Sequence, residues 1–300
     1  MNVLSVRGLC KRYGSFALRD VSFDVAPGSI TGFIGRNGAG KTTIIKHLTG
    51  VYKQDAGEVL IDGNNVYENI KLKNKTICIG DDLYFFPTYT IADMAKFYAG
   101  LYPDWDWVRY ESLKEVFKID TKRRVRKLSK GMQKQVAFWL GICTKPDVMI
   151  LDEPVDGLDP VMRRNVWKLM LQDVAERDIT VLVSSHNLRE LEDVCDHVGI
   201  MFGGKIVLEK SLDGAKGNIH KVQAAFSGFM PDELTQELNV LHSEQFGSVY
   251  SLIIKGDSSE IKNKIAAYSP LLCDILPLTL EEVFIYELGG IGYESANILL

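Results

Sequence analysis

Two short segments carry side chains suited to binding a nucleoside triphosphate. The first, Gly35 to Thr42, has the pattern Gly-x-x-x-x-Gly-Lys-Thr. Glycines in such a loop accept positive φ and leave room for phosphate, which backbone N–H groups and a helix N-terminus can bind. Lys41 would reach the β- and γ-phosphates, and Thr42 would ligate Mg²⁺. The predicted nucleotide-binding residues of this loop are Gly35, Asn37, Gly38, Gly40, Lys41, Thr42 and Thr43.

The second segment is an apolar strand that ends in two carboxylates. Val148–Leu151 is predicted as a buried strand, and Asp152 and Glu153 follow it directly. Asp152 would hold Mg²⁺ directly or through water. Glu153 points the other way out of the strand, so it can orient or deprotonate the attacking water. Together the two segments predict a nucleoside-triphosphate hydrolase.

The elements around these segments predict an α/β fold. A buried strand at 29–34 precedes the glycine loop, and a helix starts at Thr42–Leu48. Strand and helix patterns alternate between residues 148 and 202, which favours a parallel sheet with crossover helices. Residues 3–34 have strand-and-turn patterns, and residues 91–145 have helical ones, broken at Pro103. We expect a P-loop NTPase fold: a mixed or parallel sheet core, an antiparallel β subdomain, and a helical subdomain at about 83–145.

The composition changes near residues 211–218, where Gly, Asp, Lys and Asn cluster. We place a domain boundary there, between an ATPase domain at 1–212 and a small α+β domain at 213–300. Patterns in the second domain predict three strands and two helices. The strands are Lys221–Phe226, Val249–Ile254 and Leu271–Leu276, and the helices are Ser259–Tyr268 and Leu280–Leu288.

The overall composition excludes several classes of protein. Hydrophobic residues make up 46% and charged residues 25%, as in ordinary globular proteins. No uncharged apolar run reaches about 18 residues, and the first residues lack the pattern of a secretory signal. The net charge of −4 argues against a general nucleic-acid binder. Five scattered cysteines without Cys-x-x-Cys spacing argue for a reduced, cytosolic protein without a metal or disulfide framework.

Three further segments distinguish between families of nucleotide hydrolases. Leu128–Met132 (Leu-Ser-Lys-Gly-Met) precedes the acidic strand, Gly157–Pro160 follows it, and Ser184-Ser185-His186 ends the next predicted strand. No Asn-Lys-x-Asp guanine motif follows the loop, since residues 74–77 fail at the last position. In this order the segments resemble the ATP-binding-cassette family, specifically the nucleotide-binding subunit of a transporter. The resemblance covers residues 1 to about 210.

The resemblance implies roles for residues outside the phosphate loop. Tyr13 matches the aromatic that stacks on adenine, although packing within the first sheet is the alternative. Ser129 and Gly131 match the signature residues that touch the γ-phosphate of ATP held by the opposite subunit. Asp159 matches the loop that links the two sites, and His186 matches the switch histidine that contacts the γ-phosphate. ATP and Mg²⁺ are thus implied, bound at the interface of a head-to-tail homodimer or heterodimer.

The chain departs from the family's pattern beside the γ-phosphate. Asp81 or Asp82 stands where the family has glutamine, and Asp81 is our further predicted Mg²⁺ ligand. Lys130 replaces the first signature glycine, and Met132 replaces the signature glutamine. We expect Lys130 to offset the added aspartate charge across the dimer interface. Because Glu153 and His186 are present, we expect a site that hydrolyses ATP.

Two segments have unusual compositions. Residues 122–134 contain seven basic residues and no acid, which predicts a solvated face, a field that attracts ATP, or, less favoured, a nucleic-acid patch. Residues 84–107 contain nine aromatic residues. Some must be core, but exposed aromatics mark interfaces. The family resemblance implies that residues 84–89 and 102–107 receive the membrane subunit.

These observations lead to one functional hypothesis and two alternatives. We expect the ATPase subunit of an exporter of the drug- and peptide-antibiotic resistance type, with a separate polytopic membrane permease as partner. It would be cytoplasmic, peripheral on the inner face of the cell membrane, and without a nucleic-acid partner. The first alternative is a soluble ATPase of the same family that acts mechanically on ribosomes or DNA. Such proteins carry two cassettes or a long coiled coil, which this sequence lacks. The second is a regulator that binds ATP without turnover, against which Glu153 argues.

Overall fold

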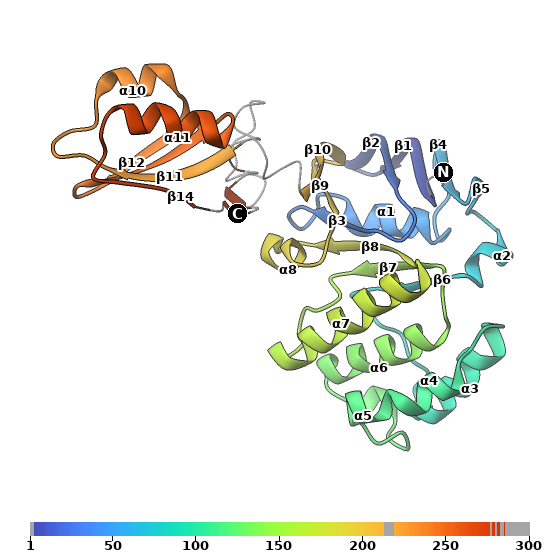
Figure 1. The fold of residues 1–300 in the computed structure, drawn as a ribbon. Coiled ribbons are helices and arrows are strands. Elements are labelled where there is room, and N and C mark those ends of the chain that lie inside the picture. Colours follow the sequence, from blue (N-terminus) through green and yellow to red (C-terminus); the bar gives the residue numbers. More distant parts are fainter. Residues whose placement is uncertain (1–2, 213–218, 277, 280, 283–284, 286–300) are drawn as a thin grey trace. The chain divides into compact units, whose positions relative to one another are not determined.

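The structure is a computed structural model that describes residues 3–212, 219–276, 278–279, 281–282 and 285. Its packing divides the chain into two units, Met1–Glu209 and Lys210–Leu300. Each unit has its own hydrophobic core. Among the described residues, no helix combines the length and apolar character needed to cross a membrane. Figure 1 shows the elements of both units.

An antiparallel sheet begins the first unit, with the strand order β2–β1–β4–β5. Alternate side chains of a strand point to the same face, and Leu4 and Val6 of the first strand are accordingly buried. The strands are β1 (Leu4–Tyr13), β2 (Phe16–Val25), β4 (Ala56–Ile61) and β5 (Asn64–Asn65). The predicted antiparallel β subdomain is confirmed.

A second sheet has six strands in the order β10–β9–β3–β8–β7–β6. Five neighbours, from β9 to β6, run parallel. The strands are β3 (Ile30–Ile34), β6 (Thr76–Ile79), β7 (Val148–Asp152), β8 (Thr180–Ser185), β9 (His197–Phe202) and β10 (Lys205–Ser211). Every residue of β3, β7 and β8 is buried, as expected for parallel strands covered on both faces. The predicted parallel sheet is confirmed.

The strand register brings the chemical segments to one edge of this sheet. Ile34 of β3 pairs with Ser185 of β8, and Asp152 of β7 pairs with Ser184. The glycine loop, the acidic pair and His186 therefore follow the carboxyl ends of three adjacent strands. Ligand sites of open parallel sheets form at this edge, because the connecting loops converge there.

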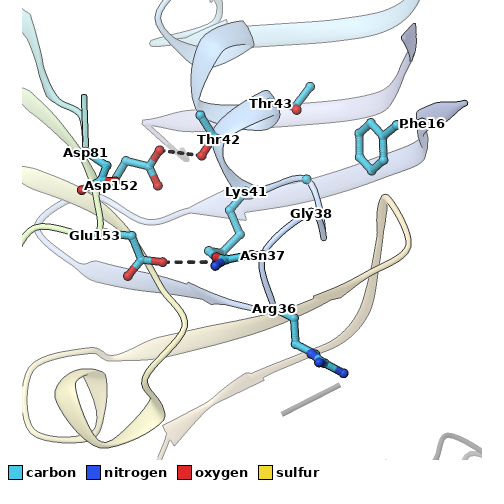
Figure 2. A pocket seen from close by; sticks show the side chains of 11 residues that line it. Phe16, Arg36, Asn37, Gly38, Lys41, Thr42, Thr43, Asp81, Asp152 and Glu153 are labelled. Carbon is cyan, nitrogen blue, oxygen red and sulfur yellow. Dashed lines mark hydrogen bonds and ion pairs between the residues drawn. The ribbon is translucent and has the colours of Figure 1, made fainter. Parts of the chain in front are cut away.

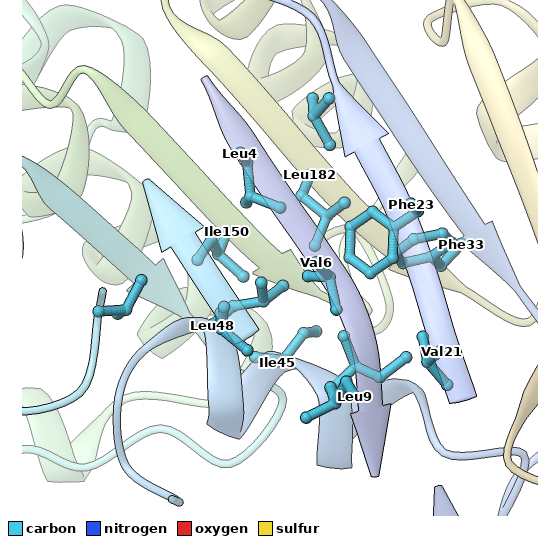
Figure 3. Close-up of a cluster of buried hydrophobic side chains, with 14 of the residues drawn as sticks. Leu4, Val6, Leu9, Val21, Phe23, Phe33, Ile45, Leu48, Ile150 and Leu182 are labelled. Atoms are coloured by element: carbon cyan, nitrogen blue, oxygen red, sulfur yellow. The ribbon is translucent and has the colours of Figure 1, made fainter. Parts of the chain in front are cut away.

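The main core encloses α1 (Lys41–Leu48), the helix that follows the glycine loop. Figure 3 shows side chains of β1 and β2 meeting Ile45 and Leu48 of this helix, with Ile150 and Leu182 from the parallel sheet. Burial of such apolar side chains stabilises by about 1.5–3 kcal/mol each. The core therefore holds α1 in place, with its N-terminus at the functional edge.

A helical subdomain is inserted between β6 and β7. Its helices are α3 (Ile91–Leu101), α4 (Trp107–Ser112), α5 (Lys114–Phe117), the 3-10 helix η1 (Val125–Lys127) and α6 (Lys130–Cys143). The predicted helical stretch is broken near Pro103 as expected, but residues 118–124 also lie outside helices. Trp139 of α6 is fully buried, stacks on Tyr110 of α4 and Phe117 of α5, and so holds these three helices together.

Three more helices complete the first unit: α2 (Ile70–Lys73), α7 (Pro160–Arg177) and α8 (Leu188–Glu192). Asp173 of α7 is fully buried and pairs with Arg109 of α4 and with Arg177. Burial raises the pKa of the Asp173 carboxyl, while the two guanidinium groups oppose that shift. This buried cluster ties the helical subdomain to α7.

The second unit contains an antiparallel sheet with the order β12–β13–β11–β14, and its described residues include the helices α10 and α11. The elements are β11 (Ile219–Ala225), α10 (Asp232–Glu237), β12 (Asn239–Phe246), β13 (Val249–Lys255), α11 (Ser258–Ala267) and β14 (Leu272–Leu276). The three predicted strands and the first predicted helix are present. The patterns miss the short helix α10, and they miss β12, which buries no residue. The predicted helix Leu280–Leu288 lies largely outside the described residues.

Candidate functional site

The glycine loop between β3 and α1 lines a pocket of about 350 Å³ (Figure 2). Gly40 caps α1 with a φ of 116°, a conformation that favours glycine. A Cβ there would lie 2.9 Å from Cδ2 of Leu18 and 3.0 Å from Cζ of Phe16, so space also requires glycine. The lining residues are Phe16, Arg36, Asn37, Gly38, Gly40, Lys41, Thr42, Thr43, Asp81, Asp152 and Glu153.

The ammonium of Lys41 lies between the loop and the acidic strand end. Its Nζ donates to the carbonyl oxygen of Gly35 at 2.5 Å and lies 3.4 Å from Oε1 of Glu153. Gly35 thus takes part in the site through its carbonyl oxygen, which holds Lys41, and it does not line the pocket. A buried cation beside the N-terminus of α1 suits a polyphosphate, because both favour negative charge.

Thr42 and Asp152 provide the oxygen atoms that a hard divalent cation requires. The Thr42 hydroxyl donates to Oδ2 of Asp152 at 2.7 Å, and Ser184 donates to Oδ1 of the same carboxylate. Figure 2 shows the carboxylate of Asp152 and the hydroxyl of Thr42 facing each other. Hydroxyl and carboxylate oxygens fit Mg²⁺, which keeps several waters and binds few protein ligands. The sequence analysis assigns no role to Ser184. The feature that could have identified it is its position two residues before His186, at the end of the same strand.

Glu153 is held in a strained conformation beside His186. Its φ of 49° is in the left-handed region, which residues other than glycine seldom adopt and which concentrates at functional sites. Oε2 lies 2.9 Å from Nδ1 of His186 and also accepts from the His186 backbone N–H at 3.3 Å. Oε1 is buried and faces Lys41 at 3.4 Å, but it accepts no hydrogen bond from the described residues and so keeps the capacity to accept one from a water near the phosphates.

Asp81 lies at the pocket, but its carboxylate has an unexpected partner. Oδ1 of Asp81 lies 3.3 Å from Nζ of Lys134 on α6. Six of the seven basic side chains between residues 122 and 134 are exposed, and Lys134 alone is buried. The solvated-face interpretation is therefore wrong for Lys134. Within one chain, Lys134 compensates the charge of Asp81, whereas the expected effect of Lys130 across a dimer interface stays a prediction.

The signature residues lie at the start of α6, outside the pocket. Ser129 is the N-cap, and its hydroxyl accepts from the Met132 N–H at 3.2 Å. At Gly131 a Cβ would lie 2.6 Å from the carbonyl oxygen of Gly157. Gly131 thus allows α6 to pack against the loop that follows Glu153. Ser129 is exposed, so its expected contact with a second subunit's ATP is sterically open.

Asp159 caps α7, accepting hydrogen bonds from the N–H groups of Val161 and Met162 at 3.0 Å. Four residues along, Arg163 pairs with Glu190 of α8 at 2.7 Å. Burial raises the pKa of the Glu190 carboxyl, Arg163 opposes this shift, and nearby Glu153 adds to it. The loop around Asp159 and the segment after His186 are therefore connected through a half-buried ion pair.

Tyr13 does not line the pocket. Its ring packs at 5.4 Å against the ring of Tyr52, and Lys11 lies 5.7 Å above it. Phe16, three residues on, does line the pocket and offers a second aromatic surface for a base. Stacking of Tyr13 on adenine stays a prediction, and Phe16 is a site residue that the sequence patterns missed.

The aromatic segment borders a separate groove of about 240 Å³ beside α3. Tyr98 and Tyr102 line this α3 groove. Tyr84, in the same aromatic segment of the sequence, has a side chain that is 77% exposed. Rings contact one another from Tyr84 through Phe86 and Phe97 to Trp107. Phe85, by contrast, is buried in the core. The groove is lined by Leu48, Thr49, Val66, Leu72, Lys73, Thr76, Ile77, Cys78, Tyr98 and Tyr102.

Comparisons with known proteins agree with this geometry. The family model described as ABC transporter matches residues 18–156. The ABC transporter ATP-binding protein YtrB of Bacillus subtilis is 32% identical over 96% of this chain and 99% of its own length. The bacitracin transport ATP-binding protein BcrA of Bacillus licheniformis is 34% identical over 71% of each chain. A solved structure of an ATP-binding subunit of an ABC transporter superimposes with a TM-score of 0.67 at 26% identity, covering 71% of this chain and 92% of its own.

Proposed function

This chain belongs to the ABC transporter family as an ATP-binding protein and ATPase, and we propose that it powers export through a separate membrane-spanning subunit. The observation that carries the proposal is one pocket that holds Lys41, Thr42, Asp152 and Glu153. The similarity to a bacitracin transport protein supports a drug- or peptide-antibiotic type of cargo. A place on the inner face of the cell membrane follows from this proposal.

In this proposal, each residue of the pocket has a separate role in ATP hydrolysis. Lys41 and the N-terminus of α1 bind the β- and γ-phosphates. Mg²⁺, held by Thr42, Asp152 and, as we propose, Asp81, would neutralise phosphate charge when bound. Glu153 accepts hydrogen bonds from His186, which orients its carboxylate, and its Oε1, which is within ion-pair distance of Lys41 but accepts no hydrogen bond, takes the proton of the attacking water.

We propose that catalysis takes place in a head-to-tail dimer. The exposed Ser129, together with Gly131, would contact the γ-phosphate of ATP bound by the partner subunit. Asp159 would join the two sites, since its loop connects to α8 through Arg163 and Glu190. ATP binding closes such a dimer and hydrolysis reopens it. The geometry is compatible with a homodimer or a heterodimer.

The α3 groove supports docking of the membrane subunit. Its walls combine aliphatic and aromatic side chains with polar ones such as Lys73 and Thr76, and the exposed side chains of Ile70 and Leu101 add apolar surface on α2 and α3. Exposed apolar patches of this kind mark interfaces. A short amphipathic helix of the membrane subunit is the occupant that this chemistry favours.

Dimer closure is tested with a variant that binds ATP without hydrolysing it. Glu153→Gln should slow hydrolysis by at least about 100-fold, the lower bound for loss of a general base. With ATP and Mg²⁺ it should elute as a dimer in light-scattering chromatography. Lys41→Ala should stay monomeric, and Glu115→Gln, an exposed change on α5, should behave as wild type. If wild type and Glu153→Gln share the same near-zero rate, the chain is a regulator and not a motor.

Docking is tested by photo-crosslinking in native membranes. A photoreactive amino acid at Tyr84 or Leu101 should capture a polytopic membrane protein, whereas one at Glu58, on the exposed face of β4, should not. Capture of ribosomal or DNA-bound proteins instead would contradict the transport proposal and would support a soluble ATPase that acts mechanically on ribosomes or DNA.

A further inference from the structure

Lys134 is a buried cation that reaches the backbone of the residue proposed to activate water. The side chain starts on α6, is 5% exposed, and donates from Nζ to the carbonyl oxygen of Glu153 at 2.8 Å. We propose that Lys134 is a positioning residue for Glu153, which keeps the carboxylate aimed at the attacking water. This role is separate from phosphate binding by Lys41.

The backbone of Glu153 needs such support because its conformation is unfavourable. A left-handed conformation is unfavourable for any residue with a side chain, and Glu153 adopts a φ of 49°. On one side its N–H donates to the carbonyl of Ser184 at 3.0 Å. On the other side Lys134 holds its carbonyl oxygen. Without that second contact, the peptide can relax and carry the carboxylate away from Lys41 and His186.

The cost of burying the ammonium explains why Asp81 belongs to the same arrangement. A buried charge is tolerated only when it is paired and hydrogen-bonded. Asp81 Oδ1 lies 3.3 Å from Nζ of Lys134, and the Asp81 side chain is 58% exposed. Asp81 therefore compensates Lys134 from the solvent side, while the Glu153 carbonyl accepts from the inner side. Removal of Asp81 should weaken the positioning without abolishing it.

Lys134 also connects Glu153 to the signature segment. It lies five residues after Ser129, the N-cap of the same helix, and three residues after Gly131. Gly131 packs closely against Gly157, four residues after Glu153. A displacement of the start of α6 is thus transmitted to both ends of the segment from Glu153 to Gly157. Contact at the signature can in this way adjust the carboxylate of the same chain.

Steady-state ATPase kinetics of the full chain test this proposal. Lys134→Met, which keeps length and removes charge, should lower kcat at least about tenfold, because small misplacements of catalytic groups are costly. KM and the affinity for MgATP should change less than about threefold, since the phosphate loop is untouched. Asp81→Asn should lower kcat to a smaller degree. Lys168→Met, an exposed change on α7, is the matched control and should keep wild-type rates.

A double-variant comparison separates positioning from a merely structural role. In the Glu153→Gln background, Lys134→Met should change the residual rate less than about twofold, because the carboxylate it positions is gone. An unchanged kcat in Lys134→Met would overturn the proposal, and so would an equal loss of rate in both backgrounds. If Lys134→Met unfolds below the assay temperature, Lys134→Gln, which keeps an amide donor, is judged by the same criteria.

Discussion

The hydroxyl of Thr42 donates to the carboxylate of Asp152 at 2.7 Å, joining two residues 110 positions apart in the sequence. One follows the phosphate loop at the start of α1, and the other ends β7. Their contact aligns the two halves of the nucleotide site. It also brings together two oxygen ligands of the kind that Mg²⁺ accepts.

We predict that Thr42→Val weakens the Mg²⁺-dependent part of ATP binding. The variant lacks the hydroxyl, and loss of groups around a metal commonly costs about 10–100-fold in affinity. ATP affinity measured in EDTA should change little, because Lys41 and the loop backbone remain. Thr42→Ser retains the hydroxyl and serves as the control. Titrations of a fluorescent ATP analogue with and without Mg²⁺ provide the measurement, and equal losses in both conditions would contradict the assignment.

We predict that Gly131→Ala destabilises the first unit and lowers ATPase activity. The new Cβ would lie 2.6 Å from the Gly157 carbonyl, so α6 or the loop must shift. Overpacking of this kind costs about 1–3 kcal/mol. Gly100→Ala on α3 is the control, since nothing lies within 4 Å of its Cβ position. The midpoint of denaturant unfolding should fall for Gly131→Ala, whereas it should rise or stay unchanged for Gly100→Ala.

We predict that stability falls as pH drops below about 6.5 because of His47. The ring is buried in α1, and burial lowers its pKa from 6.5, although the Thr43 carbonyl contact opposes the shift. Between the folded and unfolded pKa values the unfolded chain binds more protons, so this contribution is present above 6.5 and lost as pH falls. The neighbouring groups are Tyr52, Lys11 and Asp55.

The four tryptophans of the chain all lie in the first unit, so their fluorescence follows its unfolding. The decrease in unfolding midpoint between pH 7.5 and 5.5 should be smaller in His47→Gln, which retains a donor for the Thr43 carbonyl but does not titrate. His242→Gln, at an exposed position in the second unit, should keep the wild-type pH slope. Equal slopes in all three proteins would exclude His47 as the cause.

We predict that Asp173→Ala loosens the helical subdomain from α7. Removing one partner of a buried ion pair costs about 3–5 kcal/mol. We expect the lower end of that range, because Arg109 and Arg177 keep partial contact with water. Hydrogen exchange should increase in α4 and α7 before it increases in the parallel sheet. Glu176→Ala, an exposed change on the same helix, should leave exchange unchanged.

The sequence by itself determined the parts of the protein that depend on local pattern. Glycines before Lys41 and the apolar run before Asp152 identify the phosphate loop and the acidic strand. Alternation of strand and helix identifies the parallel sheet, because each crossover requires a helix. Local patterns also find β13, which is a nearly continuous apolar run, and α11, whose buried Ile261 and Ile265 are spaced by one helical turn. They miss β12, since an exposed edge strand carries no such pattern.

Only the tertiary structure decided which charges meet. Lys134 belongs by sequence to a basic surface segment, yet it is buried against Asp81 and Glu153, 53 and 19 positions away. Likewise Phe16, and not Tyr13, lines the nucleotide pocket, because β2 and the glycine loop pack together. Sequence spacing describes neighbours along one helix or strand. The partners of a buried charge depend on how separate elements pack, since the cost of burial is met by whichever acceptor the fold brings within reach.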